Sequence, residues 1–294
     1  VAVGRNALLS NTTASNNTAV GFCSLNGNTT GDLNTAIGTY AMESNTTAGA
    51  NVAIGTYAMR CNTTGGDNVA VGYASMYKNE GAGVKNTAVG CVSLCSNTTG
   101  DGNTAVGTSS LLDLTTAELV TAVGCSAGAN VTTGNGNTFF GAGAGCNVTT
   151  GNQNTAIGVN AGVDAVRDLT GSCTGNIVIG NNASVAAYIK IDWTVTSDLR
   201  DKTEIKDVKH GLDFVNQITP IEYKFKKSRE DDTPHGLTKY GFKAQEILEL
   251  EGNNPVIINN EDEENLKLTN AHLVPVLVNA IKELTARVKE LEDE

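Results

Sequence analysis

The pentapeptide Asn17-Thr18-Ala19-Val20-Gly21 decides the fold, because variants of it recur at a nearly constant spacing. The intervals between its closing glycines are 17 residues, apart from one of 18 and a last one of 22. Such a period is the sequence signature of a stacked repeat architecture. The closing glycines are Gly4, Gly21, Gly38, Gly55, Gly72, Gly90, Gly107, Gly124, Gly141, Gly158 and Gly180.

Each repeat predicts one coil of a parallel β-solenoid. The pentapeptide has the alternation of a short strand, and Gly, Asn and Thr are poor helix formers. The Val or Ile before each glycine is expected to stack into one apolar ladder, and the alternating Ala into a tight second face. The first Asn is expected to stack as an amide ladder through Asn17, Asn34, Asn51, Asn68, Asn86 and Asn103.

A second stripe of the repeat predicts association of chains. Ala or Ser lies three residues after the strand glycine, and Leu or Met follows it, as in Ala41-Met42; Gly128, Gly145 and Gly162 replace the Leu or Met in later copies. A 17-residue coil encloses little core, so this stripe is expected to need a partner surface. We therefore predict three chains packed around one axis, a trimeric solenoid shaft.

Composition divides the chain into a shaft, residues 1–186, a connecting strand or linker, residues 187–196, and a C-terminal domain, residues 197–294. Residues 1–186 carry 5 Lys+Arg and 9 Asp+Glu, and residues 187–294 carry 15 and 22, so their net charges of −4 and −7 sum to the −11 of the chain. Without a basic stripe, a nucleic-acid partner is not expected. The sequence has no apolar run of 18 residues, so a membrane span is not expected.

No metal or cofactor site is expected either. The 7 cysteines have no zinc-ligand spacing, and we interpret them as small buried residues of a protein assembled in a reducing cytoplasm. Sequons such as Asn28-Thr29-Thr30 suit either glycans or turn chemistry. Because the first residues, VAVG, lie inside a repeat, we expect the natural chain to begin earlier.

The C-terminal part predicts a small α+β domain. A strand is expected over 188–195, a short helix over 209–218, a strand over 221–225, a loop over 227–236, a strand over 239–242 and a helix over 244–250. Two further short strands are expected over 256–258 and 266–268. Apolar residues at 3,4 spacing predict a final coiled-coil helix through Val274, Leu277, Ile281, Leu284, Val288 and Leu291.

Four blocks of this part carry a resemblance: Ser197-Asp198-Leu-Arg200-Asp-Lys202-Thr-Glu-Ile205, Ile221-Glu-Tyr223, Gly241-Phe-Lys-Ala-Gln245-Glu246, and the segment 273–284. In this order, they resemble the C-terminal intramolecular chaperone of endosialidases and phage tail fibres. The resemblance covers about residues 197–294. It implies a domain that trimerises the fibre and then cuts itself off just before the serine of the Ser-Asp pair.

Carried over to this sequence, the resemblance makes Ser197 the nucleophile, Lys202 its base and Thr196–Ser197 the scissile bond. Asp198, Arg200, Gln245 and Glu246 match family positions as possible supporting residues. A lysine activates a serine only where desolvation or nearby charge lowers its pKa. Positions i and i+5 do not face each other on a regular helix, so the segment must be bent, or the lysine must come from a neighbouring chain.

These observations predict a phage tail fibre in the virion, assembled in the host cytoplasm. The repeats also resemble the shafts of phage fibres. Expected partners are two further copies, a host-surface receptor (a glycan or a surface protein), and other tail proteins through an earlier N-terminal part. The alternative is a non-enzymatic head of a trimeric cell-surface adhesin, whose short Val-Ala-Ile-Gly strands look alike. A membrane-bound transcription factor would need a DNA-binding domain and a membrane helix that this sequence lacks.

Overall fold

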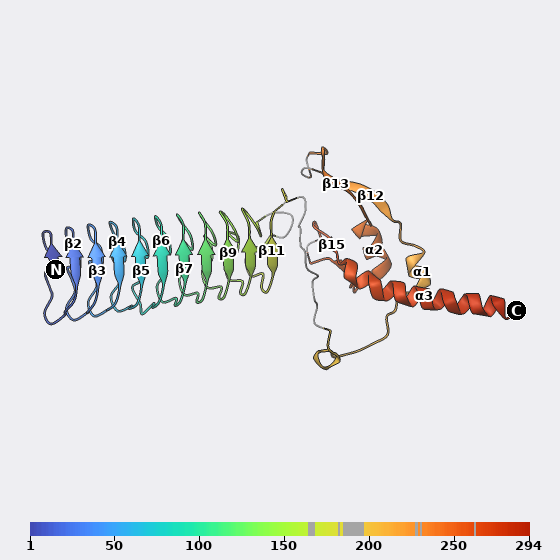
Figure 1. Cartoon of the computed structure of the whole chain (residues 1–294), viewed down its shortest axis with the longest axis horizontal. Coiled ribbons are helices and arrows are strands. Elements are labelled where there is room, and N and C mark those ends of the chain that lie inside the picture. Colours follow the sequence, from blue (N-terminus) through green and yellow to red (C-terminus); the bar gives the residue numbers. More distant parts are fainter. Residues whose placement is uncertain (164–167, 182, 185–196, 227–228, 230, 262) are drawn as a thin grey trace. The chain divides into compact units, whose positions relative to one another are not determined.

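Each pentapeptide forms one short strand, and eleven strands stack in chain order into a single parallel sheet (Figure 1). The structure is a computed structural model that describes residues 1–163, 168–181, 183–184, 197–226, 229, 231–261 and 263–294. The shaft belongs to one compact unit, Val1–Ser184, and the remaining described residues belong to a second, Val185–Glu294. The shaft strands are β1 (Ala2–Val3), β2 (Thr18–Val20), β3 (Thr35–Ile37), β4 (Val52–Ile54), β5 (Val69–Val71), β6 (Thr87–Val89), β7 (Thr104–Val106), β8 (Thr121–Val123), β9 (Thr138–Phe140), β10 (Thr155–Ile157) and β11 (Ile177–Ile179).

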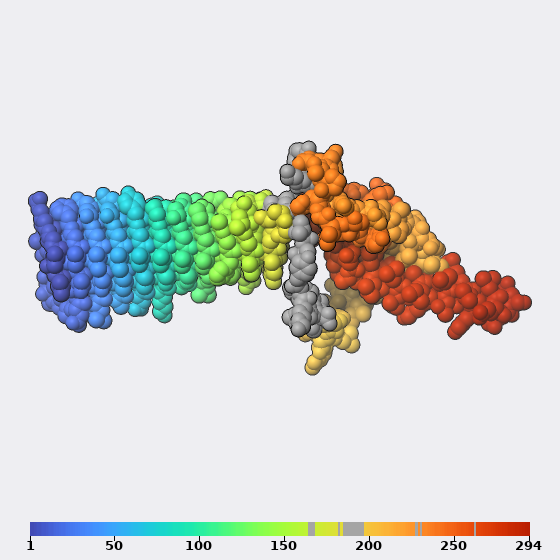
Figure 2. Space-filling model, turned by 45° about the horizontal axis from the view of Figure 1, so that its top comes forward, coloured from blue at the N-terminus to red at the C-terminus, as the bar shows by residue number. Residues whose placement is uncertain are grey.

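The strand register keeps each repeat position in a column. Thr18 pairs with Thr35, Ala19 with Ala36 and Val20 with Ile37, and the other coils continue the pattern. The stacked coils form a continuous rod in the space-filling view of this unit (Figure 2). The predicted parallel β-solenoid is therefore confirmed.

The core of the shaft lies inside each coil, and this corrects the reason given for the trimer. The strand alanines, such as Ala53, and the following Leu or Met, such as Met59, are fully buried within the single chain. Because the short coil closes on small alanines, the Ala/Ser and Leu/Met stripe needs no partner. The Val or Ile at the end of each strand instead faces outward, with 39% of Ile37 and 38% of Ile54 exposed.

Two asparagine ladders run through the shaft, where the sequence predicted one. In the predicted ladder, the side-chain amide of Asn51 donates to the carbonyl of Gly65, and its Oδ1 accepts the N–H of Asn68. A second ladder comes from the turns: Asn62 Nδ2 donates to Asn45 Oδ1 at 3.0 Å and to the Gly65 carbonyl at 3.1 Å. Its members are Asn28, Asn45, Asn62, Asn79 and Asn97, all fully buried. The sequons at Asn28, Asn45, Asn62 and Asn97 are therefore explained by turn chemistry.

The glycines after β1 to β9 are required by both backbone conformation and space. Gly55 has a φ of +133°, and a Cβ there would lie 2.4 Å from the carbonyl oxygen of Gly72 in the next coil. Any side chain would push neighbouring coils apart and break the ladder of hydrogen bonds.

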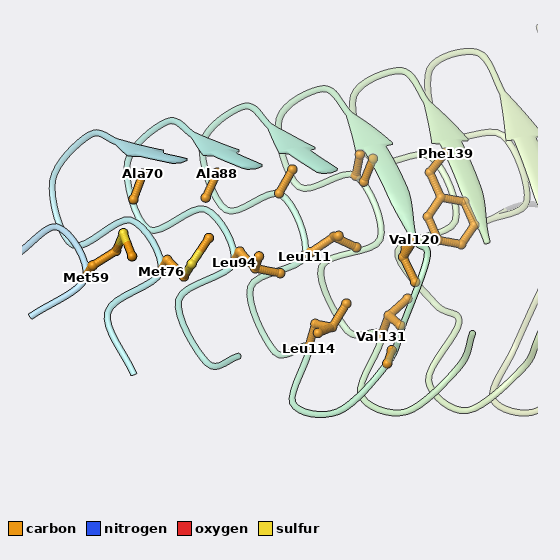
Figure 3. Packing of buried hydrophobic residues seen from close by; sticks show 14 of the residues in the cluster. Met59, Ala70, Met76, Ala88, Leu94, Leu111, Leu114, Val120, Val131 and Phe139 are labelled. Atoms are coloured by element: carbon orange, nitrogen blue, oxygen red, sulfur yellow. The ribbon is translucent and has the colours of Figure 1, made fainter. Parts of the chain in front are cut away.

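One aromatic residue compensates for two missing core side chains. Gly128 and Gly145 occupy the Leu or Met position of their coils, and Phe139 replaces the strand alanine (Figure 3). A Cβ on Gly128 would lie 2.7 Å from the Phe139 ring, and one on Gly145 would lie 2.2 Å from it. The ring of Phe139, fully buried, thus fills the volume that Leu or Met fills elsewhere.

Cysteine burial differs from the prediction. All seven cysteines are free thiols, but only Cys23 is buried, while Cys91 and Cys125 are exposed. The exposed ones occupy outward positions of the coil, where any small residue fits.

The second unit has the predicted mixture of helices and strands. The predicted strand over 221–225 and the helix over 244–250 are confirmed. The helix predicted over 209–218 shortens to a single turn, and the last predicted loop residues join β13 (Pro234–Gly241), which pairs antiparallel with β12 (Ile221–Lys226). The elements are η1 (Leu199–Asp201), α1 (Leu212–Val215), β12 (Ile221–Lys226), β13 (Pro234–Gly241), α2 (Ala244–Glu251), β14 (Ile258–Asn259), β15 (Lys267–Leu268) and α3 (Asn270–Glu292).

A small core joins these elements. Phe214 of α1, Ile247 of α2, Ile257 and Ile258 pack with Leu273 and Val276 of α3. The strand expected over 188–195, the linker 187–196 and Thr196 lie outside the described residues.

Helix α3 uses one face within its own chain and leaves the predicted seam uncovered. Leu273, Val276 and Ala280 are buried. The seam residues are exposed, with 57% of Val274 and 63% of Ile281 accessible. The seam is therefore open to other chains, and the coiled coil stays a prediction. No helix in the described part of the chain combines the length and the apolar character that crossing a bilayer requires.

Candidate functional site

Ser197 and Lys202 lie in hydrogen-bonding contact within one chain. The ammonium Nζ of Lys202 donates to the hydroxyl Oγ of Ser197 at 2.8 Å. A nucleophile and its base need this separation, since a proton must pass between the two atoms. Of the two arrangements that the i to i+5 spacing left open, the structure has the bent segment. The lysine reaches the serine of its own chain.

A tight turn between the two residues produces this contact. Leu199–Asp201 forms a single 3₁₀ turn, and the N–H groups of Asp201 and Lys202 donate to the carbonyls of Asp198 and Leu199, both at 3.2 Å. Lys202 then returns to an extended conformation, with φ of −112°. The reversal places the side chains before and after the turn on the same side.

Asp198 and Arg200 hold the turn together. The carboxylate of Asp198 caps the turn by accepting the Arg200 N–H at 2.9 Å, and Arg200 Nη2 donates to Asp198 Oδ2 at 2.6 Å. Hydrogen bonds from the Arg200 side chain and backbone lower the pKa of the Asp198 carboxyl. Both residues are exposed, so solvent screens the pair, and its value here is geometric.

The site is open in the single chain. Ser197, Asp198, Arg200 and Lys202 are all exposed. The amine of Lys202 is therefore accessible to solvent, whereas a lysine that activates a serine is ordinarily desolvated. The two side chains are thus in contact, but the single chain does not enclose them.

Gln245 and Glu246 lie at the start of α2 rather than beside the pair. Gln245 is exposed. Glu246 accepts a hydrogen bond from the Thr219 hydroxyl at 3.1 Å through Oε1, and its buried Oε2 has no partner among the described residues. In the part of the chain that the structure describes, no hydrogen bond joins either residue to Ser197 or Lys202. Their supporting role stays a prediction.

Sequence reasoning missed a carboxylate that organises the domain behind the site. Glu251, the last residue of α2, accepts the N–H groups of Val256 and Ile257 at 2.8 Å and of Ile258 at 3.0 Å. The two isoleucines are core residues, so this carboxylate holds the loop that brings them inward. Its partners are backbone amides, which leave no signal in the sequence.

A second missed contact ties the last helix to the segment after the site. Glu283 of α3 accepts the N–H of Leu212 at 2.7 Å, and Asn279 donates to the carbonyl of His210 at 3.0 Å. These bonds link the coiled-coil helix to α1 within the chain. A change in the packing of α3 would therefore reach the residues that follow Lys202.

Comparison with known families agrees with the position of the pair. Residues 197–254 match the family described as chaperone of endosialidase, and the match begins at Ser197. This match implies an autocleaving chaperone domain. Together with the β-solenoid upstream, it fits a tail fibre or tailspike with a C-terminal chaperone domain. Neither the curated proteins nor the solved structures contain a match to the chain.

Proposed function

We propose that the chain is a shaft segment of a viral tail fibre whose C-terminal domain guides trimer assembly and then cuts itself off. The carrying observation is the 2.8 Å contact between Ser197 Oγ and Lys202 Nζ, at the first residue of the family match. The scissile bond is Thr196–Ser197, so the cut separates the shaft from the chaperone.

The chemistry needs only the chain and one water. The neutral amine of Lys202 takes the hydroxyl proton of Ser197, and Oγ attacks the carbonyl carbon of Thr196. The C–N bond breaks, the α-amine of Ser197 takes a proton from Lys202, and an ester joins the two residues. Water then hydrolyses this ester, which leaves a carboxylate on Thr196 and restores the serine hydroxyl.

Assembly supplies the condition that the single chain lacks. In the single chain the pair is open to solvent. Covering the pair with neighbouring chains removes it from water and favours the neutral amine. The Ser197–Lys202 contact thus forms in each single chain, and cleavage begins only after the trimer has assembled. The order prevents release of the chaperone before the fibre has formed.

Host attachment is the proposed role of the mature fibre. A long shaft of stacked coils holds a terminal element away from its base and resists bending, because each coil is bonded to the next. The proposed partners are a host-surface receptor and other tail proteins, and the proposed location is the virion.

Self-cleavage is tested on purified full-length chain by a denaturing gel. The wild type is expected to yield a 98-residue piece, residues 197–294. Ser197→Ala and Lys202→Ala are expected to leave one full-length band. Lys202→Arg is also expected to stop cutting, since arginine keeps its charge at any workable pH.

Lys206→Ala is the matched control, because Lys206 is a nearby exposed lysine outside the contact. It should be cut like the wild type. An uncut wild-type trimer, or a cut Ser197→Ala variant, contradicts the proposal. Mass spectrometry of the shaft piece checks that it ends at Thr196.

A further inference from the structure

The outward side of the shaft sheet carries an uninterrupted apolar column. It consists of the residue that ends each strand, and we call it the outer column. Among its members, 39% of Ile37, 44% of Phe140 and 63% of Ile179 are exposed, and the valines other than the exposed Val3 are half-buried. The members are Val3, Val20, Ile37, Ile54, Val71, Val89, Val106, Val123, Phe140, Ile157 and Ile179.

The column does not serve the core of its own chain. The strand alanines and the Leu or Met positions already close the coil, and the outer column points away from them. No strand of the shaft sheet contains a charged residue, and the charged groups of the shaft lie in the turns, as with Asp32 and Asp101. A flat apolar face of this length on a solvated rod marks an interaction surface.

The spacing of the column restricts what can cover it. The side chains repeat at the strand separation, about 4.8 Å, along the whole rod. A partner must present apolar groups at the same interval over the same length. A second copy of this chain does so by construction, parallel and in register.

The area is also adequate for a stable association of copies. A wholly exposed side chain of this kind carries about 60–120 Å² of apolar surface, of which the column residues still expose a part. Covering the exposed part of eleven of them, with the flanking threonine column, approaches the roughly 800 Å² per partner of a stable interface.

The exposed seam of the C-terminal helix also favours a second copy of this chain as the partner. The apolar seam of α3, exposed at Val274, Leu277 and Ile281, has heptad spacing that suits parallel copies of itself. Both units of the chain therefore leave uncovered the surfaces that identical parallel chains would fill.

We infer that the outer column is the interface through which the shafts of parallel copies pack together. This inference rests on the proposed trimeric fibre and names its shaft surface. The inferred interface is the Val/Ile face of the sheet. The Leu/Met stripe that the sequence predicted for this role lies inside each coil. After the chaperone is cut away, this face holds the copies together.

The test compares two doubly charged variants of the full-length chain. Ile37→Glu/Ile54→Glu places two carboxylates in the outer column. Thr30→Glu/Thr47→Glu places two in exposed turn positions of the same region. Light scattering then measures the mass of the shaft piece after self-cleavage. The column variant is expected to drop threefold, to one chain, while the turn variant and the wild type keep three.

A second variant separates loss of packing from loss of folding. Val89→Thr/Val106→Thr/Val123→Thr keeps the size and strand preference of each side chain but removes apolar contact. Its far-ultraviolet circular dichroism should match the wild type, and its shafts should dissociate at a higher protein concentration. Column variants that keep a three-chain mass, or a wild-type shaft with the mass of one chain, overturn the inference.

Failure of the proposed function is distinguishable from failure of the inferred interface. If the wild type is not cut, self-cleavage is wrong, and the same variants are compared as full-length chains. A fall in full-length mass or in thermal stability for the column variants alone then still supports the interface. Equal behaviour of the column and turn variants refutes it.

Discussion

Replacing Phe139 and restoring the missing leucines should reveal a strong energetic coupling inside the shaft. Phe139→Ala removes a fully buried ring and leaves the space beside Gly128 and Gly145 empty. Such a truncation costs about 3–5 kcal/mol in the free energy of unfolding. Gly128→Leu/Gly145→Leu alone forces side chains into the Phe139 ring, 2.7 and 2.2 Å from the new Cβ atoms, which costs about 1–3 kcal/mol or more at each site.

The combined variant rebuilds an ordinary coil. Leu111 has a φ of +49° and shares the buried core with the strand residue Ala105, so leucine tolerates the backbone of this position when the strand residue is alanine. We expect the triple variant to lie within about 1–2 kcal/mol of the wild type, with a coupling free energy of about 3 kcal/mol or more.

Urea unfolding followed by circular dichroism gives the free energies of the four chains in this cycle. Amide hydrogen exchange in β8, β9 and β10 shows whether the change is local. If the effects of Phe139→Ala and the double leucine variant add to within about 0.5 kcal/mol, the ring does not replace the missing side chains, and the volume argument is refuted.

Three other variants or reactions test separate features. Asn62→Leu should lower the free energy of unfolding by about 3 kcal/mol in urea titration, because it leaves buried amide partners unpaired; no change would contradict the ladder. Glu251→Ala should cost about 2 kcal/mol and speed hydrogen exchange at the three amides that its carboxylate binds, and unaltered exchange would show that the carboxylate is dispensable. Because partial burial raises the pKa of the Cys95 thiol, iodoacetamide at pH 8 should alkylate exposed Cys125 first, as followed by peptide mass; the reverse order would refute this difference in exposure.

The candidate site could be located from sequence, but its geometry could not. The order of the blocks around Ser197 and Lys202 pointed to both residues. Their spacing left the bend undecided, because it depends on the Asp198–Arg200 contact that closes the turn. The role of Glu251 was not visible, since three backbone amides have no signature in sequence letters.

The local pattern by itself determined the repeat architecture of the shaft. Three features leave the chain few alternative folds: a glycine about every 17 residues, a strand of about three residues, and stacked asparagines. Each of them restricts the backbone conformation of the residues around it. Alternation identified the two sides of each strand. It could not say which side faced inward, because both Ala and Val are apolar.

Only the tertiary structure determined which side chains of the shaft lie in the core of the coil. A coil this short closes on alanine, as at Ala53, and therefore turns Ile54 outward, although the isoleucine is the more apolar of the two. The same closure places Met59 in the core and moves Phe139 into the space of two absent leucines. Volume inside a closed coil, rather than the hydrophobicity of each residue, made those choices.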